Sequence, residues 1–472
     1  MNFLKKIVFC VPFILGFSVM ARCQQAGQLT VIPLHNLDAF RDPGKNWSLA
    51  SDASADPGKE GNMKALPGEG AIVNVLNKKD NTQLVTKEEF GDLQLELDFM
   101  MAKNSNSGVY LEGRYEVQLL DSWTHIHPLF SDCGGIYQRW DDSRGEGREG
   151  YQGVPPLMGV ARAPGLWQHL KITFYAPRFN DQGEKTVNAR FEKVYLNGVL
   201  VQSGVAVTGP TRSSFYQDEK PMGPLMLQGD HGNVAFRNIR YGKPDTAQAE
   251  ISTDNPIMLN PQGKPYLLRS FLNYGDRKLT HVISYGNPNQ LNFSYNLKQG
   301  ALFQIWRGDF LDVTDMWHDR GEPQLAKPRG SLLILSDAPA LAVLTSPSEA
   351  WPDSIAFDDF KNEGYTLDAN RTPTFQYAWK GMEVADKISG QQPESISREI
   401  TISGVQAGLY CRIAAAKNIE KADQDLYAID DRSYYIRVDD RFRPEIRSTA
   451  AGQELIVPIG QQANPLTYSI TF

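Results

Sequence analysis

Apolar and polar residues alternate strictly between Leu93 and Phe99, where a leucine or phenylalanine takes every second position. Gln94, Glu96 and Asp98 fill the positions between them. A period of two residues is that of a β-strand with one face buried and the other turned away from the core. The pattern therefore predicts a strand over 93–99 that carries Glu96 on its polar face.

A second alternating stretch, 106–121, reads as two short extended segments joined near Gly113. In the second segment Arg114, Glu116 and Gln118 share one face, and aromatic or aliphatic residues take the other. A cation, a carboxylate and an amide in one row are typical of the floor of a polar groove. A strand face in solvent gives the same pattern, so both interpretations stay open at this point.

Other short apolar runs extend this β pattern, and no helical period of any length accompanies them. Asn197-Gly198 is a strong hairpin signal between two of these runs. Further strands are expected at 29–34, 71–76, 84–86, 167–175, 190–195, 199–201, 225–228 and 234–241. Many short strands at this spacing predict an all-β fold built as a two-sheet sandwich.

The polar segment 244–256 lacks periodicity and contains two prolines, which makes it the best candidate for a linker. It divides a first domain, 28–243, from a second domain, 257–472. Strands are expected in the second domain at 279–285, 291–297, 301–306, 332–335, 397–402 and 434–438. We therefore expect a second β-rich, sandwich-like domain, whose function the pattern does not reveal.

The first 23 residues are typical of a signal peptide, so the protein is expected to be periplasmic or secreted. Lys5 and Lys6 precede an apolar core, and Ala21-Arg22-Cys23 offers small residues for cleavage. Lipoprotein anchoring at Cys23 is the weaker alternative, because the bulky Arg22 precedes it. No later stretch reaches the ~18 apolar residues of a membrane span.

Charge and cysteine content exclude several classes of partner and cofactor. The chain has 472 residues, a formal net charge of −7 and no run of Lys or Arg, which argues against nucleic acid. Only Cys133 and Cys411 remain after signal cleavage, and no C-x-x-C-H motif occurs. A disulfide framework, a cysteine-based zinc site and an attached haem are therefore not expected.

Seven short segments in order resemble one known family. They are Asn106-Ser107-Gly108-Val109, Tyr115–Asp121, Gly134-Gly135-Ile136-Tyr137, Gly165-Leu166-Trp167, Asn197-Gly198, Leu227–Gly232 and Phe236-Arg237-Asn238-Ile239. Together they resemble the 3-keto-glucoside 1,2-lyase / 3-keto-2-hydroxyglucal hydratase family, also described as 3-keto-disaccharide hydrolases and formerly as a domain of unknown function. Across 28–243 the resemblance implies a concanavalin-like jelly-roll sandwich, secretion and the processing of oxidised glycosides. It also implies that a glycoside 3-dehydrogenase acts upstream.

The chemistry implied by this resemblance sets demands on the side chains. A ketone at C3 of a sugar acidifies the hydrogen on C2, so a base can remove it and the C1 substituent can leave. Water then adds, and the net result is hydrolysis. Such a site needs a base near C2, a cation or hydrogen-bond donor at the C3 oxygen and an acid at the departing oxygen.

Candidates for these roles come from the polar positions of the resembling segments. Glu116 is the candidate base, and Glu96 or Asp121 is the candidate second carboxylate. The other candidates are Arg114 and Arg237 for the oxyanion, His231 as acid, base or metal ligand, Gln118 and Gln228 for sugar hydroxyls, and Tyr137 and Trp123 for stacking on the ring. The carboxylates can also hold a divalent metal ion, although no ligand spacing in the sequence demands one.

Two other functions fit the same residues. A jelly roll is also a scaffold of non-catalytic carbohydrate-binding proteins, so fold alone does not establish catalysis. A conventional glycoside hydrolase needs a carboxylate pair about 5–10 Å apart. Glu96 and Glu116 would meet this need if they lay opposite each other on neighbouring strands.

Overall fold

Strands make up almost all of the regular structure. The computed structural model describes residues 29–77, 79–244, 255–317, 323–346, 348–390, 394–460 and 464–472. Within these ranges the exceptions are a four-residue helix, α1 (Thr314–Trp317), and the 3-10 turns η1 (Asp142–Arg144), η2 (Phe357–Asp359) and η3 (Asp440–Phe442). The all-β prediction is confirmed. The predicted signal peptide 1–23 and most of the predicted linker 244–256 lie outside the described residues.

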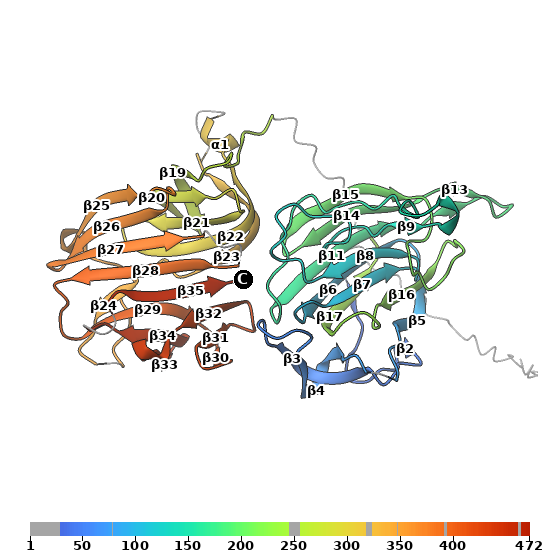
Figure 1. Ribbon diagram of the computed structural model, residues 1–472, viewed down its shortest axis with the longest axis horizontal. Helices are drawn as coiled ribbons and strands as arrows, with labels where there is room; N and C mark the ends of the chain where they lie inside the picture. The colour runs from blue at the N-terminus through green and yellow to red at the C-terminus, as the bar shows by residue number, and fades with distance from the viewer. Residues whose placement is uncertain are drawn as a thin grey trace, which may run out of the picture.

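The first half of the chain forms two stacked antiparallel sheets (Figure 1). The eight-stranded sheet contains, in spatial order, β15 (Val199–Val207), β14 (Ala189–Leu196), β11 (Trp167–Tyr175), β6 (Leu93–Met101), β17 (Val234–Gly242), β4 (Met63–Asn74) and β3 (Trp47–Ala55), with β1 (Thr30–Val31) beside β17. The five-stranded sheet contains β2 (Phe40–Arg41), β5 (Leu84–Phe90), β16 (Gly223–Leu227), β7 (Asn106–Leu111) and β8 (Tyr115–Leu120). Two small hairpins are β9 (Arg139–Trp140) with β10 (Gly150–Tyr151), and β12 (Arg178–Phe179) with β13 (Lys185–Val187).

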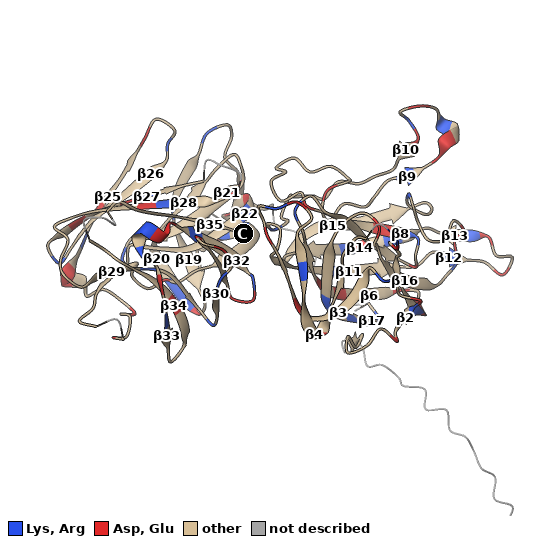
Figure 2. Ribbon diagram, turned by 60° about the horizontal axis from the view of Figure 1, so that its bottom comes forward, with Lys and Arg blue, Asp and Glu red and all other residues tan. Residues whose placement is uncertain are grey.

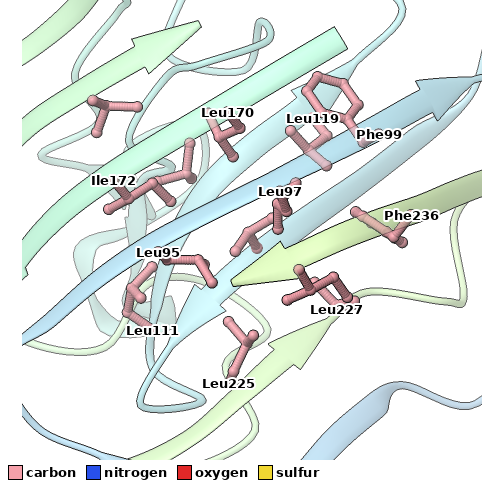
Figure 3. Close-up of a cluster of buried hydrophobic side chains, with 14 of the residues drawn as sticks. Leu95, Leu97, Phe99, Leu111, Leu119, Leu170, Ile172, Leu225, Leu227 and Phe236 are labelled. Carbon is pink, nitrogen blue, oxygen red and sulfur yellow. The ribbon is translucent and has the colours of Figure 1, made fainter. Parts of the chain in front are cut away.

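The core of this sandwich consists of the apolar halves of the alternating strands. Leu95 and Leu97 of β6 point toward Leu111, Leu119 and Leu225 of the five-stranded sheet (Figure 3). All five side chains are buried. Each such burial contributes about 1.5–3 kcal/mol relative to exposure. The polar halves of the same strands therefore lie on the outer faces, and these faces point in opposite directions.

The second half of the chain has three sheets. The six-stranded sheet contains β18 (Met258–Leu259), β22 (Ala301–Asp312), β21 (Leu291–Asn296), β20 (Arg277–Gly286) and β19 (Tyr266–Tyr274), with β23 (Lys327–Ile334) beside β22. The four-stranded sheet contains β24 (Leu341–Val343), β29 (Leu409–Ala416), β34 (Gly452–Pro458) and β33 (Glu445–Thr449). The eight-stranded sheet contains β25 (Phe360–Leu367), β26 (Pro373–Trp379), β27 (Met382–Ser389), β28 (Ile396–Ser403), β35 (Leu466–Thr471), β32 (Tyr434–Val438), β31 (Leu426–Ile429) and β30 (Ile419–Lys421). These sheets enclose a hydrophobic core of their own.

The contacts between the two halves include a small apolar cluster and the side chain of Arg237. Leu166 of the first half is buried in one cluster with Leu426 and Tyr435 of the second. Arg237 on β17 lies over the ring of Trp167, with 4.0 Å between the guanidinium carbon and the ring centroid. Its Nη1 donates to Asp431 Oδ1 at 3.0 Å, and its Nη2 donates to the other oxygen of the same carboxylate. A bidentate, stacked arginine of this kind fixes orientation as well as distance.

Replacing Arg237 by methionine should therefore lower the free energy of unfolding by about 1–2 kcal/mol, because both the fork and the stacking are lost. Calorimetry on the full chain measures this change. Arg240→Met is the matched control on the same strand. Its ion pair with Glu96, at 3.1 Å, lies within one sheet of the first half and is half exposed. An equal decrease in the free energy of unfolding in the two variants would show that the contact of Arg237 with the second half adds no stability.

Candidate active site

The outer face of the five-stranded sheet places Tyr110 and Glu116 side by side. β7 pairs with β8 so that Tyr110 lies opposite Glu116, and β16 pairs with β7 so that Met226 lies opposite Tyr110. Val109 and Val117 on these strands belong to the core. Because side chains alternate along a strand, Tyr110 and Glu116 project from the outer face.

The next row across this face consists of two amides with a glycine between them. Gln118 lies opposite Gly108, and the Gln228 backbone N–H donates to the Gly108 carbonyl at 2.9 Å. Gly108 has no side chain, and the carboxylate of Glu116 occupies that space. A Cβ added at Gly108 would lie 2.1 Å from Glu116 Oε1. The glycine is therefore required by the carboxylate that lies over it.

Burial changes the acidity of Glu116. The residue is 2% exposed, and desolvation raises the pKa of its carboxyl to about 8. A hydrogen bond from the Tyr110 hydroxyl acts in the opposite direction, and the charge of Asp230 adds to the rise. Tyr110 keeps its own proton, because burial raises the pKa of its hydroxyl well above the ordinary value. A carboxylate with a pKa near neutrality is a much stronger base than an exposed one.

A histidine paired with an aspartate borders the buried carboxylate. His231 Nδ1 lies 2.6 Å from Asp230 Oδ1 on the turn that follows β16. This hydrogen bond raises the pKa of His231, against desolvation and the nearby charge of Arg212. The His231 side chain is half exposed, so a ligand can reach its ring.

Arg212 and the β9–β10 hairpin lie at the same edge of the sheet. The Tyr110 hydroxyl oxygen also lies 3.2 Å from the Arg212 carbonyl oxygen, which competes with Glu116 for its single hydrogen. The Arg212 guanidinium stacks on Trp140 of β9 at 3.7 Å from the ring centroid. Figure 2 shows the β9–β10 hairpin extending away from the sandwich, with charged residues at its tip. An arginine and an aromatic ring are thus available beside His231.

Two amides and one tyrosine predicted from the sequence also lie at this face. Gln118 Nε2 donates to Asn106 Oδ1 at 3.1 Å. Gln228 is 6% exposed, and its Oε1 has no hydrogen-bond partner among the described residues. The Tyr137 backbone N–H donates to the Glu116 carbonyl at 3.1 Å, which places this residue along the free edge of β8. Glu116, Gln118, Gln228, His231 and Tyr137 therefore belong to one region.

Glu96 lies on the opposite side of the sandwich. It projects from the outer face of the eight-stranded sheet, where it pairs with Lys171 and Arg240 at 3.1 Å each. The hydrophobic core separates this face from Glu116. Glu96 therefore does not lie opposite Glu116 on a neighbouring strand, and the two cannot form the carboxylate pair that a conventional glycosidase needs.

Arg237 and Trp123 belong to the contact between the two halves. Arg237 shares the outer face of the eight-stranded sheet and is clamped by Asp431. Trp123 packs against the cluster around Leu166 and lies beneath Arg307 of the second half, 5.3 Å from the guanidinium carbon to the ring centroid. Neither side chain is available to a sugar bound at Glu116.

Arg114 and Asp121 have structural partners at the two ends of β8. Arg114 is 1% exposed, and it donates to the Glu112 carbonyl and to Asp218 Oδ1, both at 2.9 Å. Asp121 Oδ2 accepts from the backbone N–H of Asn104 at 2.8 Å. The other cationic candidates for the oxyanion are Arg212, whose carbonyl lies beside the Tyr110 hydroxyl, and His231, whose partner Asp230 acts on Glu116.

A second buried carboxylate, Glu112, lies in the turn between β7 and β8. It is 2% exposed, and neither of its carboxylate oxygens has a hydrogen-bond partner in the described part of the chain. Desolvation raises its pKa to about 8, the same value as for Glu116. Its charged neighbours are Arg114, Asp92, Glu219 and others at this end of the sheet. Glu112 therefore has a raised pKa like that of Glu116, but its neighbours are different.

Tyr110, Asp230 and Arg212 were not among the residues predicted from the sequence. The hairpin at Gly113 would have placed Tyr110 opposite Glu116 once strands 106–111 and 115–120 were paired in register. Asp230 adjoins His231 in sequence. Nothing local marks Arg212, because it reaches the site from a loop nearly 100 residues further along the chain.

The described ranges contain no group of three or more His, Cys, Asp or Glu side chains placed to hold a metal ion. None of the helices in the described ranges is sufficiently long and apolar to span a membrane.

The structure thus places a buried carboxylate, two amides and a His–Asp pair on one sheet face of a β-sandwich. Residues 35–241 match the family described as 3-keto-alpha-glucoside-1,2-lyase-like domain. Residues 35–241 thus match the family that the sequence resemblance implied, which supports a carbohydrate-active enzyme of the hydrolase/lyase kind. No curated protein sequence matches the chain.

Solved structures similar to this chain include two proteins of Parabacteroides distasonis ATCC 8503 and one module from Bacillus subtilis. A protein of Parabacteroides distasonis ATCC 8503, provisionally described as a glycosyl hydrolase, is 23% identical over 45% of this chain and 84% of its own, with a TM-score of 0.30. A second from the same organism is 20% identical over 42% and 99%, with a TM-score of 0.27. The carbohydrate-binding module CBM66 from Bacillus subtilis is 11% identical over 42% and 96%, with a TM-score of 0.20.

The fit between Gly108 and Glu116 predicts energetic coupling. Gly108→Ala should lower the free energy of unfolding by about 1–3 kcal/mol, because its methyl group displaces the carboxylate. In a Glu116→Ala background the same change should lower the free energy of unfolding only slightly, because the carboxylate that the methyl group would displace is absent. Denaturant unfolding of the four proteins of this double-mutant cycle measures the coupling. Additive effects would show that Glu116 does not lie over Gly108.

Proposed function

We propose that the first domain cleaves 3-keto-glycosides by removing the C2 proton and eliminating the C1 substituent, followed by hydration. The net reaction is hydrolysis of the glycosidic bond. The observation that carries the proposal is the buried Glu116 carboxylate, held next to Tyr110 on the polar face of a domain of the 3-keto-glucoside lyase-like family. The C3 ketone makes the C2 hydrogen acidic enough for such a base.

Glu116 acts as the base in the first step. The C2–H bond breaks, the proton passes to the carboxylate, and the electron pair is delocalised onto the C3 oxygen. Desolvation favours this transfer, because the product is the neutral acid that the buried site prefers. Tyr110 positions the carboxylate. Its hydrogen bond also stabilises part of the negative charge before the substrate binds.

His231 serves as the acid at the departing oxygen. Its pairing with Asp230 favours the protonated ring, as a general acid near neutral pH requires. The C1–O bond breaks with its electron pair, and the proton of His231 goes to the leaving oxygen. The C1–C2 double bond that remains is conjugated with the C3 ketone. Water then adds at C1 and gives a proton back to His231, and Glu116, after its proton exchanges with solvent, protonates C2.

Arg212 and the amides orient the sugar. Arg212 carries a fixed charge beside His231 and can stabilise the negative charge that develops on the C3 oxygen. Gln118 and Gln228 offer both donors and acceptors for sugar hydroxyls. The unpartnered Oε1 of Gln228 is suited to accept from one of them.

We further propose that the enzyme acts in the periplasm or outside the cell. The support is the charge and hydropathy pattern of residues 1–23, with cleavage after Cys23 favoured over lipidation of that residue. A 3-keto-glycoside arises by oxidation of a glycoside hydroxyl, so a glycoside 3-dehydrogenase must supply the substrate.

Substrate choice separates the proposal from its alternatives. Purified protein should cleave a 3-keto-glucoside and leave the matching unoxidised glucoside intact, and the C2 hydrogen should exchange with deuterated solvent. Cleavage of the plain glucoside alone would identify a conventional glycosidase. Binding of both sugars without turnover would identify a carbohydrate-binding module.

Glu116→Gln should lower kcat by about 10²–10⁴-fold, because the amide cannot accept the C2 proton. The same change should stabilise the fold at alkaline pH. The pKa of Glu116 is about 8 in the folded protein and near 4.5 in the unfolded chain, so the folded state binds the proton more tightly. Between these values, rising pH lowers the free energy of unfolding, and glutamine abolishes this loss. Turnover assays and unfolding at pH 5 and pH 9 measure both effects.

Glu112→Gln is the matched control for this experiment. Burial also raises the pKa of Glu112 to about 8, so this variant should show the same stabilisation at alkaline pH. It should keep normal turnover, because Glu112 lies in the turn and not beside the sugar. If both variants lose activity equally, Glu116 is not the base.

The dependence of kcat/KM on pH should identify the two titrating groups. The wild-type profile should be bell-shaped, because activity needs a deprotonated Glu116 and a protonated His231. In His231→Gln only the base titrates, so the weaker remaining activity should rise with pH and level off above about 8. Adding Tyr110→Phe should move this rise to higher pH, because the hydrogen bond that lowers the pKa of Glu116 is lost. A rise that does not move would exclude Glu116 as the titrating base.

A further inference from the structure

A cavity of about 540 Å³ opens on the second half of the molecule, away from the residues assigned to catalysis. It is bordered by β19, β20, the turn after β21 and the segment that leads through η2 into β25. Its volume lies within the range of about 300–1,000 Å³ typical of small-molecule sites. The proposed elimination makes no use of this cavity.

The titratable groups that line this cavity are all basic. Arg269, His281 and Lys298 line it, and none of its lining residues is Asp or Glu. Desolvation lowers the pKa of His281, and the charges of Lys298 and Arg269 lower it further, so the three groups lie close together. A basic cluster is unexpected in a chain with a net charge of −7. Such a cluster attracts an anion, most strongly one with a carboxylate that can accept several hydrogen bonds.

An exposed aromatic ring forms part of the same cavity. Phe357 in η2 is 88% exposed, while Phe360 and Ile355 beside it are partly buried. The Ile355 backbone N–H donates to Gln299 Oε1 at 3.0 Å, which ties this segment to the turn that carries Lys298. An aromatic side chain held in solvent beside cations offers an apolar face to the ring of a charged ligand.

We propose that this cavity binds a carboxylate-bearing sugar ring, such as a uronic acid unit of a glycan. The carboxylate would lie among Arg269, His281 and Lys298, and the apolar C–H face of the ring would pack on Phe357. The choice of a sugar over another ring-bearing acid rests on the proposed function of the first domain. The second domain would then bind an acidic carbohydrate that the first domain does not cleave.

Isothermal titration calorimetry on the full chain tests this inference with D-glucuronate and D-glucose, which differ at C6. Glucuronate should bind, and glucose should bind at least about tenfold more weakly. Lys298→Glu should weaken glucuronate binding by about tenfold or more, because it places a carboxylate in the cluster. Phe357→Ala should also weaken glucuronate binding. This variant should still fold, because the Phe357 side chain is exposed. High salt should lower the affinity.

Lys417→Glu, at an exposed lysine outside the cavity, should leave binding unchanged and controls for overall charge. Glu116→Gln should also retain binding, which separates this site from the catalytic proposal. Equal affinity for the two sugars, absence of glucuronate binding, or full binding by both Lys298→Glu and Phe357→Ala would overturn the inference. If benzoate binds as tightly as glucuronate and with the same losses in the variants, the preference for a sugar is wrong.

Discussion

The arrangement of the first domain depends on keeping the Glu116 carboxylate out of water on the outer face of a sheet. Desolvating a carboxylate is costly, and without compensation the side chain would turn to solvent. Gly108 provides the space, because any side chain there would collide with the carboxylate. Tyr110 supplies a hydrogen bond from the adjacent strand. Glycine, tyrosine and glutamate are brought together by the register of a single hairpin, so the geometry of β7 and β8 determines the acidity of the site.

The opposite sheet of the same sandwich serves a different purpose. Its outer face carries Arg237, whose guanidinium is stacked on Trp167 and clamped by Asp431 of the second half. One polar face therefore carries the residues of the proposed reaction, while the other contacts the second half of the chain. This division explains why residues such as Glu96 and Arg237 look as functional in sequence as Glu116 does. All project away from the core, and only their sheets differ.

The sequence predicts the strands well because alternation depends on local burial. The expected strand 93–99 lies within β6, and the polar row of Glu116 and Gln118 lies on a sheet face as expected. Alternation shows that a side chain avoids the core, but it does not show which of two sheets carries it. The placement of Glu96 with Glu116 failed for this reason. The structure does not place Arg237 with Glu116 either, because its partner, Asp431, is 194 residues away in the second half of the chain.

The comparison of Glu112 with Glu116 shows what identifies a site. Burial raises the pKa of both carboxylates to about 8, so acidity alone would select them equally. Glu112 lies in a turn, and its charged neighbours include Arg114 and Glu219, which are tied to their own partners. Glu116 shares its sheet face with two amides, a tyrosine and a His–Asp pair, which are the groups that the proposed reaction would use. A base becomes catalytic only where an acid and binding groups surround the same space. Position in the sheet therefore distinguishes Glu116 from Glu112. The raised pKa explains why Glu116 is suited to accept a proton in the proposed reaction.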